Sequence, residues 1–332
     1  MTRRLPDTYI FIIFTLSFML PWITADAGGE EISITRGRAL TVTENLLECA
    51  GARISGVGII TGSDQRSWTV PAETNYINGP RAPDLYNDCD GHTPSGINEI
   101  DITAIPIVEV DRDGEVITGY IFSDNYFELY VNGKLIAVDA VPFTPFNSSI
   151  VRFRARTPVT YAVRLVDWEE NLGLGTELNH GNPYHAGDGG FAAQFSDGTV
   201  TDSSWKAQVF YIAPLDEPDN LVLQADGVRS STQVDLENLH CGEDCYGVHY
   251  PLPDGWEKPG FNDSSWPDAY EFANETVVVF NKPAYMNFEH LFIGSGARFI
   301  WTSNLVLDNL VLVRKTGPAQ RTSKLSSSGG RN

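Results

Sequence analysis

A polar loop between two β-rich segments holds the residues best suited to recognise a sugar. Residues 167–188 combine aromatic rings, carboxylates, amides and histidines. Sugar binding needs an aromatic plane for the apolar face of a pyranose and planar polar groups for its paired hydroxyls. We predict that the ligand-binding residues of this loop are Trp168, Glu169, Asn171, Tyr184, His185 and Asp188. In the structural alternative the loop is simply long, and Trp168 belongs to the core beside a strand end.

The carboxylates and histidines of this loop also suit two other chemistries. Glu169, Glu170 and Asp188 offer the acid and the base of a glycoside-cleaving enzyme, but the separation of the carboxylates, which decides that reaction, cannot be read from sequence. His180 and His185 with Asp188 offer transition-metal ligands, although two histidines five positions apart in a loop are a weak pattern. We therefore expect a site without catalytic residues and keep glycoside cleavage as an alternative.

Structural calcium is a further open alternative. Residues 111–115 (DRDGE) resemble the start of a calcium-binding loop but lack the remaining ligand spacing. Asp124, Asp263 and Asp308 add oxygen donors at predicted turns. No ligand set follows from these positions, and we expect no other cofactor.

The cysteines predict disulfide bonds. Their positions are Cys49, Cys89, Cys241 and Cys245, an even set. Proximity in the chain favours pairing the first with the second and the third with the fourth. A zinc site at the second pair is the alternative, but its spacing is wider than the usual C-x2-C and an oxidising compartment favours disulfides.

The N-terminus predicts export. Arg3 and Arg4 precede an apolar run over residues 9–20, and Ala25-Asp26-Ala27 has the small-x-small pattern of a cleavage site. The run is shorter than the roughly 20 residues that span a bilayer as a helix. We predict a signal peptide over residues 1–27, a secreted, extracellular or periplasmic protein, and no membrane insertion after cleavage.

The acidity of the chain limits its partners. Lys and Arg total 23 against 43 Asp and Glu, a formal charge of -20. Such a charge repels nucleic acid and anionic lipid. Hydrophobic residues make up 42% of the chain, which is enough for a folded core. We expect carbohydrate or an extracellular glycan as the partner, and no nucleic acid.

Strand and turn patterns fill most of the chain, which predicts an antiparallel sandwich or jelly roll. Residues 105–110 and 115–122 predict a hairpin around residues 111–114, and residues 126–131 and 135–138 predict another around Asn132-Gly133. Further strands are predicted at 150–156, 160–166, 191–195, 207–212, 276–280, 297–301 and 305–314. Helix is predicted only in short pieces, such as residues 231–240 and 285–292.

A short repeat places two tryptophans after tight turns. Residues 201–205 (TDSSW) and 262–266 (NDSSW) each put a turn-forming side chain before the indole. We expect Trp205 and Trp266 to be core anchors rather than ligand platforms.

Several motifs lie between about residues 120 and 315: 122–134 (FSDNYFELYVNGK), 161–166 (YAVRLV), 189–191 (GGF), 202–206 (DSSWK), 256–269 (WEKPGFNDSSWPDA), 297–301 (ARFIW) and 311–315 (VLVRK). Together they resemble the galactose-binding-like jelly rolls, the accessory sandwich domains of many rhamnosidases and β-galactosidases. The resemblance implies an all-β, antiparallel jelly-roll sandwich that recognises or scaffolds around sugars, and we expect no barrel or helical catalytic domain beside it.

The order of these motifs differs from that in the family. There the turn of residues 256–269 and the FIW strand precede the NYFE strand, whereas here they follow it. We infer a circularly permuted sandwich in which residues 256–315 complete sheets begun by residues 120–212.

The predicted organisation is a signal peptide, an extra N-terminal β region over residues 28–110, a galactose-binding-like sandwich over residues 111–316 and a disordered tail over residues 317–332. The predicted function is non-catalytic carbohydrate binding or cell-surface recognition. A structural or adhesive extracellular matrix protein is the alternative from another class.

Overall fold

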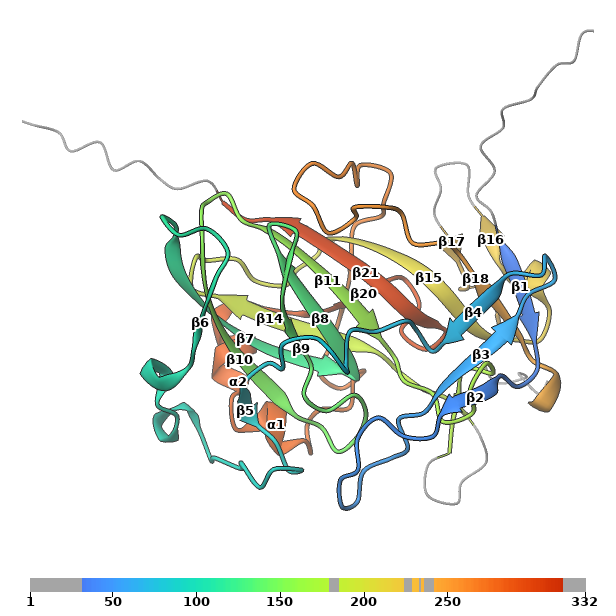
Figure 1. The fold of residues 1–332 in the computed structure, drawn as a ribbon, viewed down its shortest axis with the longest axis horizontal. Helices are drawn as coiled ribbons and strands as arrows, with labels where there is room; N and C mark the ends of the chain where they lie inside the picture. The colour runs from blue at the N-terminus through green and yellow to red at the C-terminus, as the bar shows by residue number, and fades with distance from the viewer. Residues whose placement is uncertain (1–31, 179–184, 224–228, 233, 236–241, 319–332) are drawn as a thin grey trace, which may run out of the picture. The chain divides into compact units, whose positions relative to one another are not determined.

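The computed structural model describes residues 32–178, 185–223, 229–232, 234–235 and 242–318, and these are mainly antiparallel β-structure (Figure 1). These described residues belong to one compact unit. The all-β prediction is therefore confirmed. The predicted signal peptide, most of the predicted tail and most of the predicted helix at 231–240 lie outside the described residues.

The first large sheet combines strands from both ends of the chain. Its spatial order is β1 (Ser33–Arg36), β18 (Tyr246–His249), β15 (Lys206–Leu215), β21 (Asp308–Thr316), β11 (Thr160–Val166), β8 (Tyr126–Val131) and β9 (Lys134–Val138). β21 lies between β15 and β11 and pairs antiparallel with both. The C-terminal segment thus completes a sheet that β8 and β11 begin.

The second large sheet has the order β19 (Tyr270–Phe272), β20 (Phe299–Trp301), β14 (Gly190–Phe195), β7 (Glu115–Asp124), β10 (Ser148–Ala155) and β5 (Asp84–Tyr86), with β6 (Ile107–Glu109) also paired to β10. β5 and β6 each cover a different part of β10. Segments from the predicted N-terminal region are therefore built into both large sheets.

Of the two predicted hairpins, one is confirmed and one is wrong. β8 and β9 pair around Asn132 and Gly133, whose φ values of 49° and 83° suit the turn of a two-residue hairpin. β6, however, runs parallel to β10 and does not pair with β7. Gly114 passes the end of β10 so closely that a Cβ there would lie 2.1 Å from the carbonyl carbon of Ala155. Residues 111–114 thus reverse the chain around the end of β10, so β6 and β7 pair with opposite edges of that strand instead of with each other.

The two large sheets face each other across an aromatic core. Tyr161 of β11 stacks on Phe195 of β14 with ring centroids 4.2 Å apart, and Phe153 of β10 meets the edge of Tyr161. Trp205 and Trp301 are completely buried. Because these rings come from both sheets, they join the sheets into one sandwich-like core.

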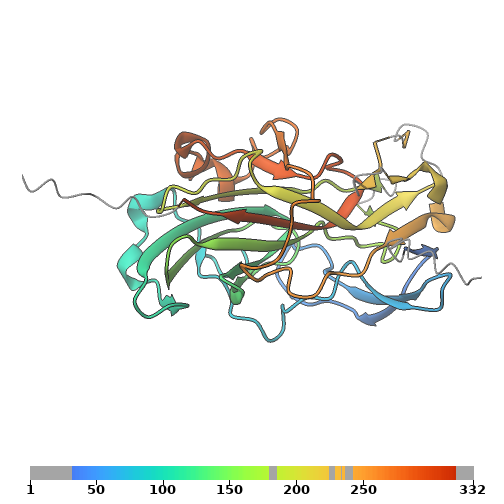
Figure 2. The ribbon, with the colours of Figure 1, turned by 90° about the horizontal axis from the view of Figure 1, so that it is seen from above.

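Smaller elements flank this core. β2 (Leu40–Thr43), β3 (Val57–Thr61) and β4 (Ser67–Val70) form a three-stranded sheet, while β12 (Thr176–Glu177) pairs β13 (His185–Ala186) and β16 (Val222–Leu223) pairs β17 (Arg229–Ser230). The short helices are α1 (Pro283–Met286) and α2 (Glu289–Phe292), with 3-10 turns at Ile97–Glu99, Ile102–Ala104, Pro218–Asn220, Gly242–Asp244 and Ile293–Ser295. Figure 2 shows the three-stranded sheet (blue) and the α-helices (orange) on opposite sides of the large sheets.

The predicted strand at residues 276–280 is wrong. The backbone N–H of Thr276 donates to the carbonyl of Ala273, and Val278 has a φ of 51°. The segment is a series of turns that buries Val277 and Val279. Alternating apolar residues are therefore buried here without a sheet partner.

Both tryptophan turns have the predicted structural role. Asp202 accepts a hydrogen bond from the backbone N–H of Ser204, and Asn262 accepts one from Ser264. Trp205 is fully buried and Trp266 is 7% exposed.

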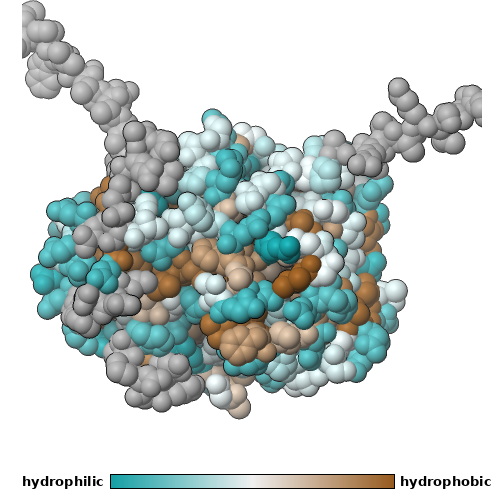
Figure 3. Space-filling model, turned by 180° about the vertical axis from the view of Figure 1, so that it is seen from behind, coloured by the Kyte–Doolittle hydropathy of each residue, from teal (hydrophilic) through white to brown (hydrophobic). Residues whose placement is uncertain are grey.

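The surface that the described residues form on the face turned away from the viewer of Figure 1 has no special pattern. Hydrophobic residues lie there in small patches between hydrophilic ones (Figure 3), as is usual for a solvated surface.

Candidate functional site

The predicted ligand loop begins at the end of β11, and its first part is folded into the core. Trp168 is 1% exposed, and its indole N–H donates to the carbonyl oxygen of Gly56 at 3.1 Å. Tyr126 packs edge-on against the indole. No ring face of Trp168 is open to a ligand, so the structure agrees with the core alternative for this residue.

Glu169 holds the turn that follows. Its carboxylate accepts hydrogen bonds from the backbone N–H groups of Gly173, at 3.1 Å, and Gly175, and from the hydroxyl of Tyr211 at 3.2 Å. Both glycines have positive φ, and a Cβ on Gly175 would lie 2.5 Å from the carbonyl carbon of Ala213. Burial raises the pKa of Glu169 to about 7. This carboxyl group is enclosed by the turn that it organises.

Asn171 closes the same turn. Its side-chain amide donates to the hydroxyl of Thr176 at 3.1 Å, and its backbone N–H donates to the carbonyl of Thr176. Asn171 is 3% exposed. The contacts fix the start of β12 and leave this amide without a surface for a sugar.

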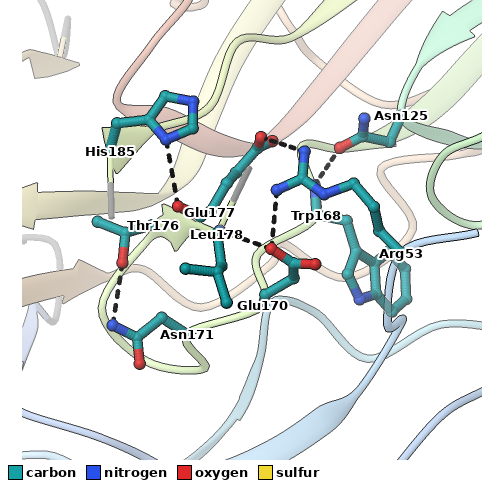
Figure 4. Close-up of polar contacts among 9 residues, drawn as sticks. All are labelled: Arg53, Asn125, Trp168, Glu170, Asn171, Thr176, Glu177, Leu178 and His185. Atoms are coloured by element: carbon teal, nitrogen blue, oxygen red, sulfur yellow. Dashed lines mark hydrogen bonds and ion pairs between the residues drawn. The ribbon is translucent and has the colours of Figure 1, made fainter. Parts of the chain in front are cut away.

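Arg53 joins the loop to a distant segment of the chain. Its guanidinium lies 2.8 Å from a carboxylate oxygen of Glu170 and 2.6 Å from one of Glu177, as Figure 4 shows. The three side chains are between 9% and 14% exposed. Glu170 also accepts the backbone N–H of Leu178. The ion pairs thus hold both ends of the segment that leads from Glu170 to the end of β12.

His185 lies on β13 directly opposite Glu177. Its Nδ1 is 3.2 Å from the carbonyl oxygen of Glu177, which can only accept a hydrogen bond. Nδ1 therefore carries the proton of the neutral ring, and Nε2 is left as an acceptor on an exposed side chain.

A cavity of about 510 Å³ opens beside this hairpin, within the range of roughly 300–1,000 Å³ typical of ligand sites. The charged and imidazole side chains that line it are Arg53, Asp88, Asp124, Glu177, His185, Asp188 and Lys282. Pro145, Phe146, Val278 and Pro283 add apolar surface. These residues come from six separate segments of the chain, which the fold brings together.

The surroundings of the carboxyl groups in the cavity disfavour their ionised forms. Burial, and next the charge of Asp188, raises the pKa of Asp124 well above its usual range. Burial and the charge of Glu177 raise the pKa of Asp188 to about 6. Burial and Glu177 also raise the pKa of Asp167, which lies just behind. A Cβ on Gly187 would lie 2.6 Å from Glu177 and 2.9 Å from Asp167, so the two carboxylates converge on this glycine.

Two of the predicted ligand residues, His185 and Asp188, line this cavity. Trp168, Glu169 and Asn171 are buried behind it, and Tyr184 lies outside the described residues, as does His180. The sequence analysis missed Arg53, Phe146 and Lys282, and it considered Asp124 only as a calcium donor. The signal for Asp124 was its place directly before the NYFE motif, whereas the other three have no local motif.

One predicted disulfide is present, between Cys49 and Cys89. Such a bond is typical of an oxidising compartment. The second predicted pair includes Cys241, which lies outside the described residues.

The turn-placed aspartates considered for calcium have protein partners. Asp263 accepts from Arg314 at 2.8 Å, and Asp308 accepts from the hydroxyls of Ser231 and Thr302. Asp111 accepts from the side chain of Asn132 at 3.1 Å. Within the described ranges, no group of three or more His, Cys, Asp or Glu side chains is arranged to hold a metal ion.

Comparison with known proteins yields no family model, no curated relative and no solved structure that matches this chain. Among the described residues, no helix is long and apolar enough to cross a membrane.

Proposed function

We propose that this chain is an exported, non-catalytic protein that binds carbohydrate in the cavity beside the β12–β13 hairpin, on a galactose-binding-like jelly roll. The observation that carries the proposal is the cavity itself, which brings His185 and Asp188 together with Asp124, Phe146 and Lys282. It combines donors and acceptors for hydroxyl groups with apolar surface for a sugar ring. The disulfide and the predicted signal peptide support export.

Glycan-array binding of the mature chain, followed by calorimetric titration with the best ligand, tests this proposal. His185→Ala removes an exposed acceptor at the cavity without opening the core, and we expect it to weaken binding by about 1 kcal/mol, or roughly fivefold. His290→Ala is the matched control, because His290 is exposed and does not line the cavity. Equal affinities of both variants and the unchanged chain would place the ligand elsewhere.

One observation favours the adhesive matrix protein as a second candidate. Leu40 and Val42 on β2 and Ile59 on β3 are 75%, 52% and 41% exposed, and Leu40 pairs with Ile59 across the strands. β2 is also the edge of its sheet. Apolar side chains on an open strand edge can bind another protein. Under this alternative, the chain binds no glycan on the array, and combining Leu40→Lys with Val42→Lys abolishes its adhesion to immobilised matrix protein.

A further inference from the structure

The charges that line the cavity do not balance. Four carboxylates face it, from Asp88, Asp124, Glu177 and Asp188, against the two cations Arg53 and Lys282, counted over the described lining residues. A ligand that brings its own positive charge would reduce this excess.

Arg53 already forms ion pairs with acidic side chains of this chain. Its guanidinium contacts Glu170 at 2.8 Å and Glu177 at 2.6 Å, and its other face covers the ring of Phe143 at 4.6 Å. Two carboxylates thus share one arginine. Arg53 therefore balances the charge of Glu177 without offering an anion-binding group to the cavity.

Lys282 is the other cation, and it is shared as well. Its ammonium lies 4.1 Å from the ring centroid of Phe146. Its charge favours the ionised forms of both Asp124 and Asp188. One ammonium cannot balance the buried Asp124 and the half-buried Asp188 together.

Asp124, Asp167 and Asp188 make up the unbalanced part of the site. Asp124 is 3% exposed and lines the cavity, and its Oδ1 accepts a hydrogen bond from the side chain of Asn125 at 2.6 Å. Asp167 is also 3% exposed, and its Oδ1 has no hydrogen-bond partner among the described residues. Their location beside an open cavity provides room for an external partner.

We propose that this cavity selects a cationic sugar, one that carries a primary ammonium group such as a 2-amino-2-deoxyhexose unit, over neutral and acidic sugars. The inference rests on the proposed function, because it assigns the ligand class of the same cavity. The ammonium would lie between Asp124 and Asp188, where it supplies the missing positive charge and up to three hydrogen bonds. The sugar ring would lie against the apolar walls formed by Pro145, Val278 and Pro283.

The cavity suits an organic cation better than a bare metal ion. A calcium ion needs six to eight oxygen ligands at about 2.3–2.6 Å, and the described acidic side chains are not grouped in that way. Pro145, Val278 and Pro283 instead give the cavity apolar walls. Val278 has a φ of 51°, a left-handed conformation that is strained for a β-branched residue and is often retained at ligand sites.

Isothermal titration of the mature chain at pH 7 provides the test, with three probes: a β-1,4-linked glucosamine tetramer, its fully N-acetylated form and a galacturonic acid tetramer. We expect the glucosamine tetramer to bind about tenfold or more tightly than the acetylated one, and the acidic probe not to bind. Equal binding of the first two probes would overturn the selectivity and leave the proposed function intact. Binding of none of the probes, together with an empty glycan array, would refute the proposed function itself.

Two substitutions with opposite expected signs separate electrostatics from folding. Asp188→Asn should weaken glucosamine binding about tenfold, while the exposed Asp254→Asn, which removes the same charge outside the cavity, should not. Lys282→Met keeps the apolar stem over Phe146 but removes the competing ammonium, so it should tighten binding several-fold. Weaker binding by Lys282→Met, with an unchanged thermal melt, would overturn the proposal.

Proton release gives a readout that does not depend on affinity. The groups that interact with Asp188 are Glu177 of β12, His185 of β13, Asp124 of β7, Asp167 after β11 and Lys282 before α1. Burial and Glu177 keep the pKa of Asp188 at about 6, so a bound ammonium should displace protons from the carboxyl groups at pH 5.5. Titrations in two buffers with different ionisation enthalpies should show net proton release, and net uptake or no exchange would contradict the proposal.

Discussion

Arg53 and Glu177 are 124 positions apart in the chain, and the guanidinium Nη1 lies 2.6 Å from the carboxylate Oε2. The same guanidinium reaches Glu170, so one side chain fixes both ends of the segment that leads into the β12–β13 hairpin. The cavity therefore depends on an ion-pair network that spans three parts of the chain.

Removing Arg53 should destabilise the fold more than removing an arginine from an exposed ion pair. Arg53→Met leaves Glu170 and Glu177 partly buried without a counter-charge, which should cost about 3–5 kcal/mol in the free energy of unfolding. Urea unfolding at pH 7 measures this change. Arg156→Met is the control, because its pair with Asp113 is 65% exposed on both sides and should leave stability nearly unchanged. Similar losses in both variants would contradict a special role for Arg53.

Trp168 provides a second prediction, on stability and binding together. Because its indole is enclosed and donates to Gly56, Trp168→Ala should lower the free energy of unfolding by about 3–5 kcal/mol. Phe280→Ala should change it little, since Phe280 is 62% exposed. Thermal melts and glycan titration should be run on each variant. A Trp168→Ala chain that melts normally but no longer binds sugar would show that the indole contacts the ligand after all.

The fold was predictable where local patterns and long-range packing agree. Residues 160–166 carry an uninterrupted strand pattern, and β11 has those bounds. Asn132-Gly133 specifies a turn by its own backbone preference, so the hairpin around it was predicted correctly. Residues 111–114 also form a turn, but the strand before it, β6, pairs with β10 and not with β7. No local pattern reveals which strand will be that partner.

The candidate site was predictable only in part, for a similar reason. His185 and Asp188 belong to the polar loop and were found by composition. Composition also predicted Glu169 and Asn171 as ligand residues, but their side chains form hydrogen bonds within the turn. Polar side chains are equally suited to holding tight turns. Arg53 and Lys282 come from segments more than 90 positions from that loop, and only the tertiary fold brings them to the cavity.

Buried carboxyl groups should make the protein lose stability as the pH rises. Burial raises the pKa of Asp139 to about 8, although Asn147 and the backbone N–H of Val141 donate to it. A group whose pKa is higher in the folded state stabilises fully below its unfolded pKa of about 3.9, and this contribution is lost as the pH rises through 8. One such group changes the free energy of unfolding by about 1.4 kcal/mol per pH unit between these values.

Asp139→Asn tests this dependence, because the amide oxygen can still accept both hydrogen bonds. We expect urea unfolding at pH 4.5, 6 and 7.5 to show a shallower decline than in the unchanged chain, by about one proton. The exposed Asp254→Asn should retain the original slope. If the two slopes are the same, Asp139 is ionised in the folded state at these pH values.

His249 should make the protein lose stability as the pH falls. Its ring is 2% exposed, stacked between Trp68 and Tyr211 at centroid distances of 5.0 Å and 4.4 Å, and hydrogen-bonded through Nε2 to the hydroxyl of Thr35. Burial lowers its pKa to about 3. The stability that comes from the neutral ring is present above the unfolded pKa of about 6.5 and is lost as the pH falls toward 3.

His249→Phe keeps the aromatic stack but removes the titrating group, and Thr35 retains the carbonyl of Gly247 as a partner at 3.3 Å. Between pH 4 and 6.5, His249 offsets the decline caused by carboxyl groups such as Asp139. The variant should therefore lose stability with rising pH more steeply than the unchanged chain, by about 1.4 kcal/mol per pH unit, and the two slopes should converge above pH 7. Urea unfolding at half-unit steps measures both slopes. An unchanged slope below pH 6.5 would mean that His249 takes up its proton in the folded protein, and the stack would then have to accommodate an imidazolium.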